Sequence, residues 1–275
     1  MPVVLTLKNA TTIPVEVDSI RLELVREQSS EDIARTLVHY GNKQLELGEF
    51  FGVSGTAVED NTLVWQGDCS RIKLIGTGLA SGTVIVEGAA GMHVGAEMTG
   101  GNVEVRGHAG DWAGAEMHGG RIWIRGNAGN CVGAVYRGGR RGMTGGEILI
   151  EGNCGDELGH TLRRGTIAVR GKVGAGVGFN MLAGTLLLFG GSGIRPGAGM
   201  RRGTIVYLGQ EPAPPMLPTY KLAGEVEPIF LGVYLRHLRQ IGWTVPPECF
   251  AARYRRFNGD FLELGKGEIL VRQAV

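Results

Sequence analysis

The sequence contains few of the residues on which cross-linked, collagen-like and membrane-spanning proteins depend. Cysteine occurs only four times, at positions 69, 131, 154 and 249, and no CxxC pair is present. This spacing excludes the common zinc and iron–sulfur motifs and a disulfide framework, and it favours a reducing compartment. Because there are only 10 prolines and glycine has no three-residue period, collagen is excluded. No apolar run approaches the roughly 18 residues that a membrane helix needs.

An excess of charge of one sign is also absent. The chain carries 28 basic and 27 acidic residues, a formal net charge of +1, so no overall field attracts nucleic acid or an anionic membrane. Its first residues lack the basic start and the following apolar run of a signal peptide. We therefore expect a cytoplasmic protein without nucleic-acid or membrane partners. Because 43% of its residues are hydrophobic, we also expect it to fold.

Glycine is the residue that the sequence has in excess. The 48 glycines make up roughly 17% of the chain, against about 7% in an average protein. Many belong to a unit of five residues between two glycines, as in Gly82-TVIVE-Gly88. The seven units begin at Gly82, Gly101, Gly120, Gly146, Gly165, Gly184 and Gly203. Their starts are 19 residues apart, except for one interval of 26 residues that holds a seven-residue insertion.

The repeat predicts a mostly β protein built as a right-handed parallel β-helix of about seven 19-residue turns. Each unit has apolar second and fourth strand positions, and 19 residues are too few for the helix-containing repeats of about 33 residues or more. Stacked turns place equivalent residues in columns, and neighbouring residues within a column lie about 4.8 Å apart. Glycine allows the tight corners between strands. The right hand of the helix follows from the general right-handedness of parallel crossovers. The predicted interior columns are Val84, Val103, Ile122, Ile148, Ile167, Leu186 and Ile205; Val86, Val105, Ile124, Ile150, Val169, Leu188 and Tyr207; and Met98, Met117, Tyr136, Leu162, Met181 and Met200.

The segments on either side of the repeat predict short α/β caps, because the ends of a stacked repeat expose unpaired strand edges. We expect an N-terminal cap in residues 1–60 and the glycine-rich β-helix repeat domain in residues 61–209. Residues 210–275 are expected to form a proline-containing linker, a helix and a closing strand.

Two helices and one strand are expected in these flanks. Ser29 or Ser30 is predicted to cap a short helix that runs to about His39. Residues 230–241 carry an apolar stripe with helical spacing. Residues 267–272 repeat the pattern of the glycine-bounded strands and are expected to add one strand to a sheet edge.

One outward-facing side of the repeat becomes apolar toward its end, and such a patch needs a cover. The sequence leaves two possibilities open for this cover, namely the chain's own C-terminal segment or a second protein subunit. The predicted interface residues on this side are Trp123, Leu149, Leu187, Phe189, Val206 and Leu208.

The seven-residue insertion is the second candidate interface. It places Arg137, Arg140 and Arg141 on one protruding loop. Guanidinium groups bind carboxylates in a bidentate geometry, so the loop suits a carboxylate-rich ligand or an acidic partner surface. A solvated basic loop is the equally weighted alternative.

No catalytic, cofactor-binding or metal-binding residue is predicted in this chain. The GxG fragments do not lie between a strand and a helix, as a dinucleotide site requires, and no P-loop lysine is present. His93, Trp112, Cys131 and Glu157 occupy equivalent repeat positions, and the first three are expected to form one column, the corner column. Because His93 and Cys131 would lie two turns, or about 9.6 Å, apart, they are too distant to share a metal. The methionine column is interpreted as core filler rather than as a set of soft-metal ligands.

The repeat pattern G-x-[IV]-x-[IV]-x-G-x-[AC]-G-x-x-x-G resembles a known family. It is similar to the β-helical C-terminal domain of the glutamate synthase large subunit, and it resembles the C subunit of formylmethanofuran dehydrogenase more closely. The segment Gly41–Gly55 and the insertion Tyr136-RGGRRGMTG-Gly146 resemble motifs of the latter protein, so the likeness covers about residues 40–210. The tail, with Arg253-YRRFNG-Asp260 within it, looks more like the bacterial form found in the formyltransferase/hydrolase complex.

The resemblance, and not the composition, implies a function. It implies a non-catalytic structural subunit of a complex that moves a formyl group from tetrahydromethanopterin to a methanofuran-type carrier and hydrolyses it to formate. The implied partners are a zinc amidohydrolase-like subunit and a formyltransferase subunit, with zinc in the hydrolase and no cofactor in this chain. Two alternatives stay open: the C subunit of a molybdenum or tungsten formylmethanofuran dehydrogenase that reduces CO₂, and a glutamate-synthase-type β-helix spacer.

Overall fold

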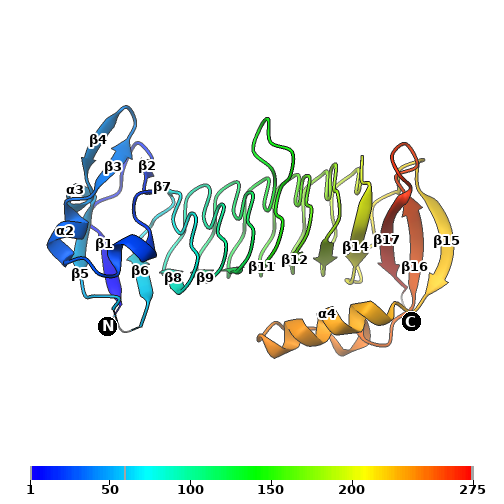
Figure 1. The fold of residues 1–275 in the computed structure, drawn as a ribbon. Coiled ribbons are helices and arrows are strands. Elements are labelled where there is room, and N and C mark those ends of the chain that lie inside the picture. The colour runs from blue at the N-terminus through cyan, green and yellow to red at the C-terminus, as the bar shows by residue number, and fades with distance from the viewer. Residues whose placement is uncertain (1, 59, 274–275) are drawn as a thin grey trace.

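The computed structural model describes residues 2–58 and 60–273, and the fold is mostly β (Figure 1). Within these described ranges thirteen strands form one mixed sheet, and four strands form a second, smaller sheet near the N-terminus. The molecule is elongated, and the strands of the large sheet follow one another along its long axis (Figure 1). The mostly β class predicted from the repeat is therefore confirmed.

Seven strands make up the repeat stack, which spans residues 82–209. They are β8 (Thr83–Val86), β9 (Asn102–Val105), β10 (Arg121–Ile124), β11 (Glu147–Ile150), β12 (Thr166–Val169), β13 (Thr185–Leu188) and β14 (Arg202–Tyr207). Each strand pairs in parallel with the next, and the register aligns equivalent repeat positions, as Ile122 with Val103 and Ile148. The first two predicted interior columns are confirmed, because their side chains are at most 2% exposed.

Successive repeats are also bonded away from the strands. A line of parallel bridges starts at Cys69, just before the stack, and joins one residue in each of the first six repeats: Ala90, Ala109, Ala128, Cys154, Val173 and Ser192. At another corner, the N–H of Gly114 donates to the carbonyl of Val94 over 2.8 Å. Because each repeat is held to its neighbour along several lines, equivalent side chains stay in columns around the whole stack.

Glycine at the strand ends is required by the closeness of successive repeats. A Cβ built on Gly107 would lie 2.7 Å from the carbonyl carbon and oxygen of Gly88. These are backbone atoms, which cannot move aside as the end of a side chain can. The abundant glycine therefore lets consecutive repeats approach each other at backbone distance.

The third predicted column needs one correction. Met98, Met117, Leu162, Met181 and Met200 are fully buried as expected, but Tyr136 is only partly buried and leaves the column. Met143 takes the place of Tyr136 and is 0% exposed. The reason is the insertion, since the chain leaves the stack at Tyr136 and rejoins it at Met143, whose N–H donates to the carbonyl of Gly133.

The N-terminal region extends the large sheet and adds the smaller one. Strand β6 (Thr62–Gln66) pairs in parallel with β8 and with β1 (Val3–Leu7), and β5 (Phe51–Ser54) forms the sheet edge. The remaining elements are β2 (Val15–Glu16), β3 (Leu37–Tyr40), β4 (Lys43–Glu46), β7 (Ile72–Lys73), α1 (Leu22–Val25), α2 (Ser30–Ala34) and α3 (Leu47–Phe50). Strands β4, β3, β2 and β7 make the smaller sheet in that order.

The predicted N-cap is confirmed, but the predicted helix is too long. The Oγ of Ser29 accepts a hydrogen bond from the N–H of Asp32 over 3.1 Å, and α2 follows it. The helix ends at Ala34 instead of reaching His39, because residues 37–40 form β3. In β3 a buried Val38 stands between the exposed Leu37 and His39, as expected for a strand whose successive side chains point to opposite faces. Strands β2 and β4 pair with the two edges of β3.

The C-terminal region closes the large sheet and covers one of its faces. Its elements are β15 (Lys221–Val226), α4 (Ile229–Gln240), the 3₁₀ helix η1 (Pro247–Cys249), β16 (Tyr254–Gly259) and β17 (Lys266–Arg272). Strand β17 pairs in parallel with β14, which confirms the predicted closing strand, and β16 and β15 continue the sheet in antiparallel fashion. Helix α4 runs beneath the last strands of the repeat stack (Figure 1).

A ladder of side-chain to backbone hydrogen bonds reinforces one corner. The Oδ1 atoms of Asp111, Asn130 and Asp156 each accept an N–H from the following repeat, at 2.7–2.8 Å.

Replacing Asn130 with alanine leaves the N–H of Asp156 without this acceptor, and we expect the free energy of unfolding to fall by about 1 kcal/mol. Urea unfolding measures the change. Asn102→Ala is the control, since Asn102 is exposed and its side chain has no hydrogen-bond partner among the described residues, and an equal loss in both variants contradicts the expectation.

Candidate functional site

The apolar outer face predicted as an interface lies inside the molecule. Leu149, Leu187 and Val206 are 0% exposed and Leu208 is 1% exposed. They pack against residues of α4 and of the segment that follows it, among them Leu231, Leu235, Leu238 and Trp243. Of the two covers left open by the sequence, the chain's own C-terminal segment is therefore the one observed. The four side chains are therefore covered within the chain itself, which leaves almost none of their surface accessible to another subunit.

Trp123 and Phe189 lie at the border of this covered face. The Nε1–H of Trp123 donates to Glu151 over 2.9 Å, and the guanidinium of Arg125 lies 3.9 Å from the Trp123 ring centroid. Phe189 stands 5.9 Å, centroid to centroid, from the ring of Trp243. Both side chains are partly buried within the chain, and an interface role for them stays a prediction.

The insertion forms a protruding loop, residues 136–142, on the side of the molecule opposite α4 (Figure 1). Two hydrogen bonds anchor its ends: the N–H of Tyr136 donates to Glu116 over 3.0 Å, and the N–H of Gly142 donates to the Thr161 carbonyl over 3.0 Å. Its three arginines, Arg137, Arg140 and Arg141, are all exposed. In the described part of the chain no carboxylate pairs with any of them, so their charge is free for a ligand or partner.

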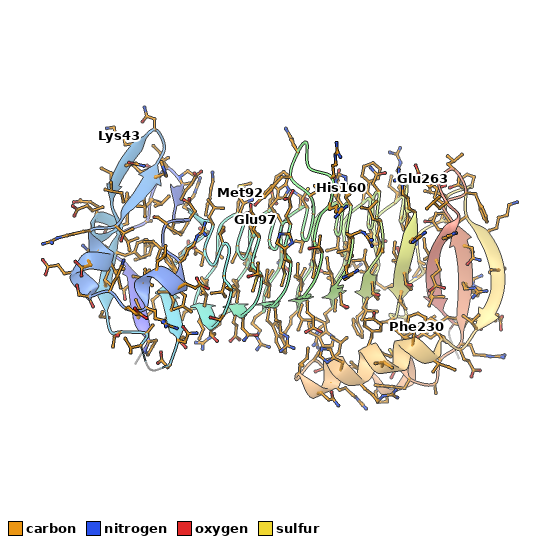
Figure 2. The ribbon with its side chains drawn as sticks, in the orientation of Figure 1. Lys43, Met92, Glu97, His160, Phe230 and Glu263 are labelled. Carbon is orange, nitrogen blue, oxygen red and sulfur yellow. The ribbon has the colours of Figure 1, made fainter. Side chains whose placement is uncertain are left out.

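A hollow of about 700 Å³ lies beneath and beside this loop. The sequence presents the loop and the corner column as separate features, but the structure brings them together. The hollow is lined by Arg137 and Arg140 of the loop and by Trp112, Cys131, Glu157 and His160 of the corners. His160 projects on this side of the molecule, as does Glu263 (Figure 2).

Two lining residues of the hollow have no sequence signal that singles them out. Arg201 follows the last repeat corner, and Glu263 comes from the β16–β17 connection, 62 residues farther along the chain. Their side chains form an ion pair of 3.0 Å. Only the return of β17 beside β14 brings them together, and the repeat period does not encode that pairing.

The column of His93, Trp112 and Cys131 is confirmed in part. The His93 and Trp112 rings stack with centroids 5.7 Å apart, and Tyr136 packs on His93 at 5.5 Å. Burial, with a smaller effect of Lys73, lowers the pKa of His93. Burial raises the pKa of the Cys131 thiol to about 11, with a further contribution from Glu157. An activated nucleophile needs the opposite shift, so this column suits packing rather than nucleophilic catalysis.

The raised pKa makes the reactivity of Cys131 testable. At neutral pH we expect iodoacetamide to modify Cys131 in the folded chain about a hundredfold more slowly than in urea, because about a hundredfold less thiolate is present. The rate should rise tenfold per pH unit up to about 11. The pKa is raised on folding, so the thiol's contribution to stability is complete below about pH 9 and is lost as the pH rises further. Peptide mass spectrometry measures the rate, and equal rates in both states contradict the expectation.

Metal-binding and membrane-spanning features are not evident in residues 2–58 and 60–273. Within these ranges no three side chains of histidine, cysteine, aspartate or glutamate are grouped as a metal site requires. None of the helices in the same ranges has the length and apolar character needed to cross a bilayer. The absence of a cofactor from this chain stays a prediction.

Comparison with curated proteins gives several partial relatives of this glycine-rich, mostly β chain. The C subunit of a molybdenum-containing formylmethanofuran dehydrogenase from Methanothermobacter marburgensis is 40% identical over 95 residues, which is 34% of this chain and 24% of the relative. The tungsten-containing form from the same organism is 34% identical over 97 residues, 34% of this chain and 36% of its own length. The likeness therefore spans about a quarter to a third of these relatives. No protein-family model matches the sequence.

The comparison with solved structures covers nearly the whole chain. The fold defines a class of glycine-rich repeat proteins with a covered outer face. A chain of the formyltransferase/hydrolase complex (FhcABCD) from Methylorubrum extorquens, solved with methylofuran, superposes with a TM-score of 0.90. It is 30% identical, and the match covers 98% of this chain and 100% of that one. This chain belongs to the family formed by the C subunit of formylmethanofuran dehydrogenase and its counterpart in the formyltransferase/hydrolase complex.

Proposed function

We propose that this chain is a non-catalytic structural subunit of a formyltransferase/hydrolase complex. In that complex a formyl group passes from tetrahydromethanopterin to a methanofuran-type carrier and is hydrolysed to formate. One observation carries the proposal, namely the end-to-end match, with a TM-score of 0.90, to a chain of such a complex. Partial likeness to the archaeal subunits agrees with it.

The described side chains support a structural rather than a catalytic role. In the hollow, Glu157 is paired with His160 and Glu263 with Arg201. Burial raises the pKa of the Cys131 thiol, which moves it further from the reactive thiolate form. The thiol is therefore not an activated nucleophile, and the three exposed arginines suit binding.

The architecture that we propose for this role is a right-handed parallel β-helix. Its support is the parallel register of β8–β14 together with the line of bridges on another side of the repeats. With it we propose three parts: a cap in residues 1–60, the repeat domain in residues 61–209 and a closing unit in residues 210–275. A stiff rod of stacked turns can hold other subunits at fixed positions along its length.

The partners of the chain follow from the proposed complex. We propose a zinc amidohydrolase-like subunit and a formyltransferase subunit, with zinc held by the hydrolase and none held by this chain. We also propose a cytoplasmic location for the assembly. The insertion arginines, which pair with no carboxylate in the described ranges, support a protein partner, since exposed guanidinium groups bind carboxylates well.

A second candidate is the C subunit of a formylmethanofuran dehydrogenase. The observation that favours it is the 40% identity over 95 residues to the molybdenum-containing form, which exceeds the identity to the hydrolase-type chain. That likeness covers only 34% of this chain, whereas the hydrolase-type match covers 98%. We therefore place the hydrolase-type complex first.

Native purification distinguishes the two candidates. The tagged full-length chain is purified from its source under mild conditions, its partners are identified by mass spectrometry, and bound metals are measured. A zinc hydrolase and a formyltransferase in stoichiometric amounts support the proposal. Molybdenum or tungsten with a pterin supports the dehydrogenase candidate, and a chain that purifies without either set of partners contradicts both.

A further inference from the structure

The connection between β16 and β17 carries an exposed apolar tip. Phe261, Leu262 and Leu264 are 52%, 81% and 54% exposed. Three large apolar side chains within four residues on one loop are unusual for a surface that faces only water. The tip lies at the end of the molecule that β15, β16 and β17 form (Figure 1).

The tip is held rigidly despite this exposure. Asp260 is only 4% exposed, and its two carboxylate oxygens accept the N–H groups of Gly199 at 3.1 Å and Leu262 at 3.0 Å. The N–H of Gly265 donates to the Asp260 carbonyl over 3.0 Å, and that of Phe261 to the Thr219 carbonyl over 3.1 Å. A preorganised apolar projection loses little conformational entropy on binding, so it is well suited to insertion into a partner.

The tip and the insertion loop border the same hollow. Glu263 at the tip and Arg201 beneath it line the hollow on one side, and Arg137 and Arg140 line it on the other. Glu263 and His160 project on the same side of the molecule, whereas Phe230 of α4 lies on the opposite side (Figure 2). We call residues 136–142, the hollow and residues 260–265 together the hairpin–insertion surface.

The charges of the hairpin–insertion surface indicate what it binds. Among the described residues the carboxylates that line the hollow, Glu157 and Glu263, already have partners, His160 and Arg201, at 3.0 Å each. The exposed arginines of the loop have no such partner within the same ranges. A second copy of this surface brings arginines and no free carboxylate from its hollow, so like charges would meet. A flat bilayer also leaves the hollow between the two projections unfilled.

We propose that the hairpin–insertion surface docks a different protein chain, one that presents carboxylates to the insertion arginines and an apolar recess to Leu262. The inference rests on the proposed function, because the docked chain is a neighbouring subunit of the same complex. It assigns the contact to the side of the molecule opposite α4, where the predicted insertion interface lies, and not to the apolar outer face. Apolar anchors that fill pockets supply much of the binding energy at protein interfaces, and complementary charges supply specificity and fast association.

Site-specific photo-cross-linking in the intact complex tests the location. Leu262, Arg140 and, as a control, Leu24 of α1 are replaced one at a time with p-benzoylphenylalanine in the tagged full-length chain. Leu24 is 57% exposed at the other end of the molecule. We expect the probes at positions 262 and 140 to link to the same partner subunit. The partner residue linked to position 140 should lie within a few residues of an aspartate or glutamate. Links only to lipid or to another copy of this chain, or no links in an assembled complex, overturn the inference.

Substitutions measure the strength of the contact. Two variants are compared with the wild type: the double variant Arg140→Glu with Arg141→Glu, and the single variant Leu262→Asp. Each variant should retain that partner about tenfold less, or weaker still, in native mass spectrometry. Thermal unfolding of each variant should match the wild type, because the three side chains are exposed. Lys43→Glu and Leu24→Asp are the matched controls. Wild-type retention in both test variants contradicts the inference, and a wild-type chain that purifies alone contradicts the proposed function and the inference together.

Discussion

Replacing Leu235 with aspartate is expected to detach α4 from the repeat stack and to lower the free energy of unfolding by about 4 kcal/mol or more. Leu235 is 0% exposed and packs within the cluster that includes Leu187 and Val206. Removing a buried leucine side chain costs about 2–5 kcal/mol, and an aspartate placed there also loses its hydration. The outward-facing leucines and valines of β11–β14, which α4 covers in the native chain, would then be exposed to water and should drive aggregation.

Val233→Asp on the same helix is the matched control for this prediction. Val233 is 60% exposed, so aspartate there stays in water and should change stability by less than about 0.5 kcal/mol. Urea unfolding, followed by circular dichroism, and light scattering measure the two effects. Similar unfolding midpoints for the two variants would show that α4 does not seal the outer face.

The second large effect is expected at Gly114, where alanine should destabilise the chain by about 2–4 kcal/mol. Gly114 has φ +64°, and a Cβ there would lie 2.5 Å from Cδ1 of Ile148 and 3.0 Å from that of Ile122. The left-handed backbone costs an alanine about 1 kcal/mol, and overpacking a core adds about 1–3 kcal/mol. The clash falls on the interior column that holds successive repeats in register.

Gly138 separates the two causes, because it has φ +86° but nothing within 4 Å of its Cβ position. Gly138→Ala should therefore cost about 1 kcal/mol, the backbone part alone. Chemical unfolding of the two variants in parallel gives the difference. An equal loss at both positions would mean that backbone strain, and not the contact between repeats, accounts for the glycine at this corner.

The repeat stack is predictable in detail because each position is constrained by the same position one repeat away. The 19-residue period predicts which side chains share a column, and the register of β8–β14 bears this out. The period does not say where an insertion leaves and rejoins the stack. It therefore predicts Tyr136 in the core column, whereas Met143, seven residues later, is the residue buried there.

The cover of the outer face and the hollow are harder to predict, since both depend on chain returns over long distances. A helix at residues 230–241 is predictable from its stripe, but its position beneath β11–β14 is not. The arginine insertion is recognisable in the sequence as an exposed loop. Its neighbours Arg201 and Glu263, and the apolar tip at 261–264, join it only through the pairing of β17 with β14. The pattern of residues 267–272 predicts a strand that joins a sheet edge, but it does not predict which side chains of the preceding connection reach the hollow.

Formate release is the direct test of the proposal that this chain is a structural subunit without an active site of its own. The natively purified complex and the isolated full-length chain are assayed side by side at equal concentration with formyl-tetrahydromethanopterin and a methanofuran-type carrier. We expect formate from the complex and none above background from the chain alone. Turnover by the isolated chain would contradict the proposal.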